Sequence, residues 1–569
     1  MSDDLSASVV CFTPRRVPVT TLGHSSTADT AEPSACSAPT IPVRPCPVCP
    51  RLDQEFEPWR QAAYWKAQHQ RALARQQDLL LEIERLQAQL RLREQQLFGR
   101  KSEAGSTANE ASTPPQPTPK KPRGQQRGQP GPSRRDHSHL PAREELLDLP
   151  PAQQCCSDCG QPLASFPGTE DSEVLEIEVQ AHRRVLRRRR YRPTCACAHN
   201  PGLVSAKAAA KVIPKSIIGV SIWVEVLLDK FLFYRPTYRL LAEWQTRGLD
   251  LSLGTLTDGL QRLLPLFQPL YQALVARSQQ QTHWHADETR WLVFATVEGK
   301  VGYRWFLWLF HSEEVVVFVL SSGRAHDVPE EHLGPVQEGI LSVDRYSAYK
   351  AMRQVKEGLL VLAFCWAHVR RDFLEAARCW PREEVWALGW VERIGQLYQA
   401  NEARLQALES QPATFAQKDG QLRQQVADMA AQTQQELAAA QLHPARKRVL
   451  TSLQEHWAGL TVFVEHPEVP LDNNTAERAV RGPVVLRKNS YGSGAVWAGE
   501  LAALLFSLFQ TLCLWNINPR QWLTAYLQGC AEAGGQVPSN WEELLPWRLS
   551  AEQRQAWSLK KETESADSS

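Results

Sequence analysis

The stretch THWHADETRWLVF, residues 282–294, decides the fold of the middle of the chain. It is rich in the aromatic and β-branched residues that strands favour, and Asp287 lies within it. The next two apolar runs, WFLWLF at 305–310 and VVVFVL at 315–320, have the same character. The sequence therefore predicts three consecutive strands, the first of which carries an acid.

Two more strands follow. Residues 339–343 form the fourth, with Asp344 at its tip, and LLVLAF at 359–364 forms the fifth, before a helix at 367–377. Three consecutive strands with an acid on the first, then an acid at the end of the fourth, is the order of an RNase-H-like core. We therefore assign residues 281–374 to the first part of an α/β, RNase-H-like catalytic core.

A third acid, Glu477, lies in LDNNTAERAVR at 471–481, where the two asparagines make a good helix N-cap. Carboxylates on adjacent strands can bind Mg²⁺, and two such ions can activate an attacking oxygen and stabilise a leaving oxygen in phosphoryl transfer. Each acid has an alternative explanation. Asp287 could be a lone acid in a turn, Asp344 could cap the next helix, and Glu477 could belong to a capping box.

Basic residues lie close to these acids. The helix of Glu477 also carries Arg478, Arg481, Arg487 and Lys488, a set suited to phosphates. Cys365 and His368 have the spacing of a ligand pair, but no second pair lies nearby in the sequence, so we favour packing or DNA positioning. Arg370 and Arg371 follow on the same helix and could reach phosphates.

Residues 375–470 separate Asp344 from Glu477 and are rich in Gln, Ala, Leu and Glu. We expect a helical subdomain inserted into the core; a coiled dimerisation element is the alternative. The core then resumes at 471–515 with the helix that carries Glu477, and 516–569 form a C-terminal helical segment and tail.

Composition sets outer limits on the whole molecule. The chain has 569 residues, 43% of them hydrophobic and 22% charged, so wholesale disorder is excluded. The net charge is only +2, so any affinity for nucleic acid must come from local patches. The N-terminus, MSDDLSAS, is no secretory signal, and the longest apolar stretch, 501–515, is interrupted and too short for a membrane span. We expect a cytoplasmic protein.

The N-terminal part is predicted in three segments. Residues 1–54 are rich in Pro, Ser and Thr and are assigned to a disordered extension, in which Cys46 and Cys49 have zinc spacing but no obvious second pair. Residues 55–103 form a long helix whose leucines follow heptad spacing, which favours self-association over a single surface helix. Residues 104–149 are a Pro/Gly-rich basic linker that could hold DNA phosphates or simply act as a spacer.

A cysteine module is predicted at 150–200. The pairs Cys156/Cys159 and Cys195/Cys197 resemble the four ligands of a zinc ribbon, although the second pair is tight and Cys155 and His199 are possible substitutes. A hairpin lies between the pairs, with its returning strand at 182–193. Its basic residues, which include Arg187, Arg188, Arg189 and Arg190, outnumber the nearby glutamates, which favours a DNA contact over cross-strand pairing. Residues 201–280 are predicted to be helical, with a possible helix-turn-helix.

Several of these motifs together are specific. The stretches LFGRKSE (97–103), HADETRW (285–291), VDRYSAYK (343–350), CWAHVRRDF (365–373) and DNNTAERAVRGPVVLRKNSYGSGA (472–495), with the cysteine module, resemble the bacterial insertion sequence 66 transposase family. The resemblance implies a DDE-type enzyme in which Asp287, Asp344 and Glu477 bind metal. It also implies catalysis within a complex on the element's DNA ends, with companions encoded beside it.

The expected reaction follows from these assignments. Water, positioned by two Mg²⁺ or Mn²⁺ ions, attacks the phosphodiester at each element end, and the freed 3′-hydroxyl then attacks target DNA. We expect Asp344 to bridge both ions. The zinc module and coiled coil would recognise ends and pair protomers in a nucleoid-associated homo-oligomer. Two alternatives remain: an RNase-H-like nuclease that cuts without joining, and an inactive, transposase-derived DNA-binding regulator.

Overall fold

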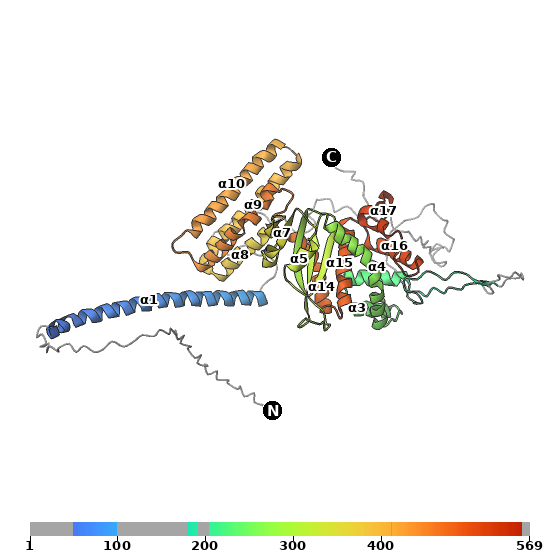
Figure 1. Cartoon of the computed structure of the whole chain (residues 1–569), viewed down its shortest axis with the longest axis horizontal. Coiled ribbons are helices and arrows are strands. Elements are labelled where there is room, and N and C mark those ends of the chain that lie inside the picture. The colour runs from blue at the N-terminus through green and yellow to red at the C-terminus, as the bar shows by residue number, and fades with distance from the viewer. Residues whose placement is uncertain (1–48, 99–178, 192–203, 411, 560–569) are drawn as a thin grey trace, which may run out of the picture. The chain divides into compact units, whose positions relative to one another are not determined.

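The computed structural model describes residues 49–98, 179–191, 204–410 and 412–559. Within these ranges the chain is a mixed α/β protein, mostly helical, with one five-stranded mixed sheet (Figure 1). The four predicted zinc ligands, Cys156, Cys159, Cys195 and Cys197, and the basic linker lie outside the described residues.

The N-terminal helix, α1, runs from Cys49 to Phe98. It therefore includes residues 49–54, which we had assigned to a disordered extension, so that assignment is wrong for these six positions. The heptad residues Leu79, Ile83 and Leu90 are each at least 50% exposed. A stripe of exposed aliphatic side chains is what a coiled-coil partner would cover, but pairing itself stays a prediction.

The arginine-rich segment at 179–191 is exposed along its length. The strand predicted at 182–193 is wrong for 182–189, which have no regular structure. Only Arg190–Tyr191 form a strand, β1, and it pairs antiparallel with β2, Val204–Ser205. Four consecutive arginines repel one another and leave this strand few apolar side chains to bury, so the segment has little packing to hold it extended.

All five strands predicted for the core are present. They are β3 (His283–Leu292), β4 (Arg304–His311), β5 (Val316–Ser321), β6 (Gly339–Val343) and β7 (Leu360–Phe364). Their order in the sheet is β5-β4-β3-β6-β7, so the first strand in sequence lies in the centre. The pairs β5-β4 and β4-β3 are antiparallel, whereas β3-β6 and β6-β7 are parallel.

Side chains alternate between two apolar layers, one on each face of the sheet. Leu307 and Leu309 of β4 join a core built with α2 (Val220–Phe231), α4 (Leu253–Ser278), α15 (Val496–Leu514) and α16 (Pro519–Glu532). Trp308 and Phe310, the residues between and after them, join the opposite core. That core is closed by three short helices, α5 (Asp327–His332), α6 (Ser347–Ala351) and α7 (Arg353–Lys356).

Helix α15 is longer than the apolar stretch that the sequence suggested. By length and composition alone it could cross a membrane, but 67% of its apolar window is buried inside the protein. Ser507 and Thr511, which interrupt the run, bond to the backbone of β5 at Phe318 and Val316. These contacts explain why polar residues stand in an otherwise apolar helix: α15 is the central core helix behind the sheet.

The remaining helices flank these layers. Helix α3 (Thr237–Thr246) precedes α4, as the possible helix-turn-helix required, and α4 buries one face from Leu256 to Leu274 in the core. Its role in DNA reading stays a prediction. After α16 the described residues contain three short elements: η3 (Trp541–Leu544), η4 (Pro546–Arg548) and α17 (Ala551–Ala556).

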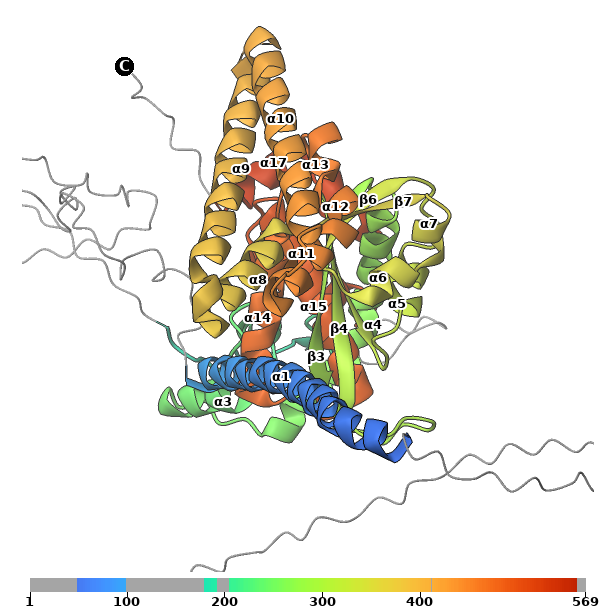
Figure 2. The ribbon, with the colours of Figure 1, turned by 90° about the vertical axis from the view of Figure 1, so that its left-hand side faces the viewer.

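The predicted insertion at 375–470 is mostly helical, as expected from the sequence, and its first helix begins earlier, at Trp366. Figures 1 and 2 show its two longest helices, α9 and α10, lying side by side. It has a core of its own, built around Trp366, Trp390 and Leu450. Its elements are α8 (Trp366–Cys379), η2 (Pro381–Glu383), α9 (Glu384–Ser410), α10 (Pro412–Leu437), α11 (Pro444–Glu455), α12 (Trp457–Leu460) and α13 (Val462–Glu465).

The buried histidine His332, which packs against the sheet, should make the stability of the fold depend on pH. His332 stacks on Phe310 at 4.1 Å, lies 3.2 Å from the Ser278 hydroxyl, and burial lowers its pKa to about 3. The unfolded chain, with a histidine pKa of about 6.5, binds this proton more readily. The stability that neutral His332 contributes is therefore complete above pH 6.5 and is lost as the pH falls towards 3.

We expect His332→Phe to flatten this dependence. Between pH 4 and 6 the free energy of unfolding of the wild type should fall by about 1.4 kcal/mol per pH unit more than that of the variant, the value for one proton. Urea unfolding at several pH values measures both slopes. Parallel curves would show that His332 is not buried in the neutral form.

Candidate active site

The fold brings the three predicted acids together near the carboxyl end of β6, beside the central strand β3. Asp287 lies within β3, and Asp344 directly follows β6. These strands are parallel neighbours, and His285 is paired with Ser342, so the two acids, each two residues further on, lie next to one another. Glu477 lies in the first turn of α14 (Asn474–Ser490), which packs against β3.

The carboxylates of Asp344 and Glu477 both affect the ionisation of Asp287. The pKa of Asp287 is raised to about 7, first by burial and then by repulsion from Glu288, Asp344 and Glu477. A hydrogen bond from the Glu288 backbone N–H to Asp287, at 2.8 Å, works in the opposite direction but does not prevail. Asp287 is therefore half-buried, and the negative charges of Asp344 and Glu477 disfavour the ionised form of its carboxyl group.

Asp344 is held by its own loop. Its Oδ1 accepts a hydrogen bond of 2.9 Å from the backbone N–H of Tyr346. The next residue, Arg345, crosses to the helical insertion, where its guanidinium donates to Ser452 at 2.9 Å and pairs with Asp372 at 2.5 Å. The loop after β6 is therefore fixed both by a turn at Asp344 and by a bridge to α8 and α11.

His368 was not assigned to the site from the sequence, yet it lies there. Its Nε2 is 3.7 Å from Oε1 of Glu477, and its Nδ1 is buried without a hydrogen-bond partner among the described residues. Burial, the largest cause, and Arg371 lower its pKa, while Glu477 and Asp344 act in the opposite direction. The sequence could have indicated this, because His368 comes just after the fifth strand and the carboxyl ends of parallel strands lie on the same side of a sheet.

Glu288, the acid after Asp287, was also missed. Because neighbouring residues in a strand point to opposite faces, it lies on the side of α6, with its side chain only 2% exposed. Tyr349 donates its hydroxyl to Glu288 at 2.8 Å, and Nε of Arg324 donates at 3.0 Å. Burial nevertheless raises its pKa. Glu288 therefore ties β3 to the helix that follows Asp344.

The predicted phosphate-binding residues are spread over three regions. Arg478, Arg481 and Lys488 are exposed on α14. Arg487 is half-buried and donates to Thr289 of β3 at 2.9 Å, so it also fastens α14 to the sheet. Arg371 is exposed and Arg370 half-buried on α8, and the run Arg187, Arg188, Arg189 and Arg190 is exposed.

Among the residues that the structure describes, no three His, Cys, Asp or Glu side chains are arranged to hold one metal ion together. This does not conflict with the chemistry of the three acids. Mg²⁺ usually keeps several waters and takes only one or two carboxylates from a protein, the rest of its shell coming from phosphate. A cluster of mutually repelling carboxylates, such as the one around Asp287, fits divalent cations bound by pairs of acids.

Known proteins resemble the chain over this same region. The family model described as "Transposase IS66 family" matches residues 215–501. Two uncharacterized proteins from Sinorhizobium fredii are similar. The protein y4jD is 28% identical over 73% of this chain and 81% of its own length, and y4hP is 26% identical over 71% and 75%.

The family match begins before α2 and extends into α15, so it contains the whole sheet, the helical insertion and all three acids. The chain belongs to the IS66 family of transposases.

Proposed function

We propose that this transposase is a DDE-type enzyme that cuts DNA at the ends of its element and joins them to target DNA, with Asp287, Asp344 and Glu477 as its acids. The observation that carries the proposal is the placement of the acids: Asp287 lies on the central strand, Asp344 follows its parallel neighbour, and Glu477 begins the helix that packs against β3. The strand order β5-β4-β3-β6-β7, with an acid on the central strand and one after its parallel neighbour, supports an RNase-H-like core.

The proposed cofactors are two Mg²⁺ or Mn²⁺ ions. When bound, such ions supply an activated water and stabilise charge on the leaving oxygen. Asp287, Asp344 and Glu477 are the residues that would hold these ions, and the repulsion that Asp344 and Glu477 exert on Asp287 is what a bound cation would relieve.

Other side chains would orient the substrate. Arg478, Arg481 and Lys488 are exposed on the helix of Glu477 and would hold the DNA backbone beside the acids. His368, next to Glu477 and with a lowered pKa, is neutral at pH 7 and would keep that carboxylate in place without neutralising it. The phosphodiester would be cut by water to leave a 3′-hydroxyl, which would then displace a target-strand oxygen.

The remaining assignments complete the proposal. The zinc module with Cys156, Cys159, Cys195 and Cys197 would recognise the ends, and the exposed leucines of α1 would pair protomers into a homo-oligomer. Double-stranded DNA, both element ends and target, is the proposed partner, with accessory proteins of the same element. A protein with this role would act in the cytoplasm, at the nucleoid.

The test is strand transfer by the purified protein. Labelled element ends, a target plasmid and Mg²⁺ or Mn²⁺ are incubated together, and products are separated by size. The proposal expects nicked ends and also ends joined to plasmid. Nicked ends that are never joined would point to a nuclease, and intact ends that are nevertheless bound would point to a DNA-binding regulator.

Cys156→Ser tests the zinc assignment. Because four thiolates hold a structural zinc ion and losing one opens the site, we expect the variant to release zinc and to bind element ends more weakly. Elemental analysis gives the zinc content, and a gel-shift titration gives the affinity. Equal zinc content in wild type and variant would contradict the assignment.

A further inference from the structure

We propose that Asn473 is a positioning residue that holds the start of α14 against β3 and thereby sets Glu477 opposite Asp287. The inference rests on the proposed function, because it gives Glu477 a place in the chemistry. The sequence suggested only one role for Asn473, that of a helix cap.

The contacts of Asn473 join three elements. It is only 3% exposed. Its Nδ2 donates to the carbonyl oxygen of Ala286 at 2.8 Å, and its Oδ1 lies 2.9 Å from Nδ1 of His285. Its backbone N–H points at Sγ of Cys365, the residue before α8, at 3.2 Å. Both β3 partners directly precede Asp287.

The bond to Ala286 fixes the amide's orientation. A carbonyl oxygen can only accept, so the atom that faces it must be the NH₂ group of Asn473. Oδ1 must then accept from His285, whose Nδ1 carries the proton. Each end of the amide thus has one partner on the same strand, a pairing that a side chain without both a donor and an acceptor cannot reproduce.

Asn473 does not act as an ordinary helix cap. It occupies the N-cap position of α14, but its side chain makes no cap hydrogen bond. Its backbone carbonyl accepts from the N–H of Glu477 at 3.2 Å, and Oδ1 of Asp472 takes the N–H of Asn474 at 3.0 Å. The Asn473 side chain therefore takes no part in capping α14 and binds the strand instead.

The spacing explains why this contact bears on Glu477. Residues four apart lie on the same face of a helix, so the face that Asn473 fastens to β3 is the face that carries Glu477. Without the two side-chain bonds the first turn is free to shift along the strand. A displacement of about 1 Å at a catalytic group can cost roughly a hundredfold in rate.

Asn473→Ser separates positioning from capping. Serine is as good an N-cap as asparagine, so α14 should still form, but its side chain is too short to bond to both His285 and Ala286. We expect cleavage of saturating, pre-bound ends to fall roughly a hundredfold. We also expect weaker Mn²⁺ binding and faster amide hydrogen exchange in the first turn of α14, while affinity for the ends is unchanged.

The neighbouring Asn474→Ala is the matched control. Asn474 is half-buried, and its side chain makes no hydrogen bond to the residues that the structure describes, so cleavage, Mn²⁺ binding and exchange should match the wild type. Asn473→Ala, which removes the same bonds and the cap residue, should lose as much activity as Asn473→Ser. An Asn473→Ser protein that cleaves and exchanges as the wild type does would overturn the inference.

Failure of the proposed function would look different. If the wild type does not cut DNA, or if Glu477→Gln cuts as well as the wild type, the assignment of Glu477 is wrong. Hydrogen exchange then still decides whether Asn473 holds α14 to β3, because it needs no activity. Unchanged exchange in Asn473→Ser would overturn the inference in that case too.

Discussion

Asp344→Asn is expected to abolish strand cleavage and strand transfer and to leave binding to the element ends unchanged. The asparagine keeps the shape of the side chain, and its Oδ1 can still accept the hydrogen bond from the Tyr346 N–H that shapes the loop. What it loses is the negative charge that would bind a divalent cation. Several kcal/mol of transition-state stabilisation depend on that charge, which corresponds to a rate roughly a thousandfold lower or more.

A surface acid provides the control for this change. Asp258→Asn makes the same substitution on α4, where the aspartate is 62% exposed and pairs with Arg262 one turn away. We expect normal cleavage, measured as the single-turnover rate on a labelled end. If Asp344→Asn cleaves like Asp258→Asn, Asp344 has no part in the chemistry; if it fails to bind ends at all, its role is structural.

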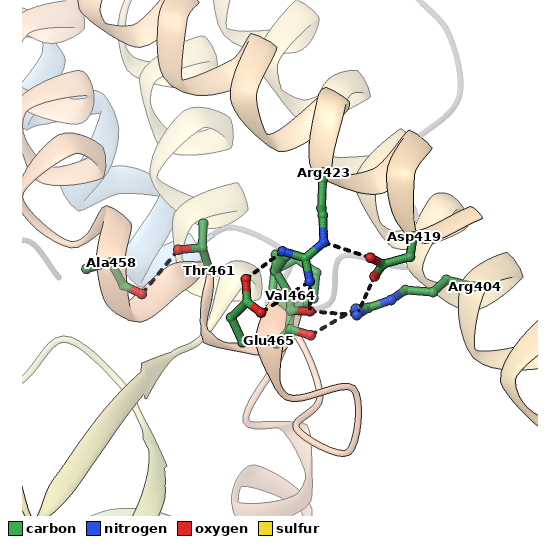
Figure 3. Close-up of polar contacts among 8 residues, drawn as sticks. Arg404, Asp419, Arg423, Ala458, Thr461, Val464 and Glu465 are labelled. Atoms are coloured by element: carbon green, nitrogen blue, oxygen red, sulfur yellow. Dashed lines mark hydrogen bonds and ion pairs between the residues drawn. The ribbon is translucent and has the colours of Figure 1, made fainter. Parts of the chain in front are cut away.

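Arg404→Leu is expected to destabilise the helical insertion more than any surface change. Figure 3 shows the side chain of Arg404, from α9, pointing toward the C-terminal end of α13 and toward Asp419 of α10. Its guanidinium donates to the carbonyl of Phe463 at 3.0 Å and to that of Val464 at 2.6 Å, and it pairs with Asp419 at 2.6 Å, while its side chain is 2% exposed. Breaking such a buried pair costs about 3–5 kcal/mol.

Arg423 is the matched control, since it pairs with the same aspartate, at 2.7 Å, but is 44% exposed (Figure 3). Because solvent screens exposed pairs, Arg423→Leu should cost about 1 kcal/mol or less. Urea unfolding, followed by the far-UV circular dichroism of the helices, measures both losses of stability. Equal losses in the two variants would mean that the buried network does not hold α9, α10 and α13 together.

The sequence predicted the sheet well because its strands differ clearly from their surroundings. Residues 305–310 and 315–320 are nearly all apolar, and they are buried on both faces, so periodicity and burial agree. The inserted helices were predictable from a long segment with few strand formers. The arginine-rich segment was predicted as a strand only because it returns from a hairpin, and its run of arginines supplies few apolar contacts to keep it extended.

The site was only partly predictable. Asp287 stands out as an acid within a predicted strand, Asp344 as an acid after one and Glu477 as an acid in a first helical turn, and their order indicated a common site. The sequence could not show that the side chain of Asn473 bonds to a strand 188 residues away instead of capping its own helix. Likewise, His368 was assigned to packing or DNA positioning, because the residue that it lies beside, Glu477, is distant in sequence. Such contacts depend on tertiary packing, which local patterns do not encode.

The measurement that tests the central claim most directly is transposition in cells. A marked copy of the element with its own flanking ends is supplied with the wild-type protein or with Asp344→Asn, and insertions at new sites are counted. The account predicts insertions with the wild type and none with the variant, at equal protein levels. Equal numbers of insertions with both proteins would contradict it.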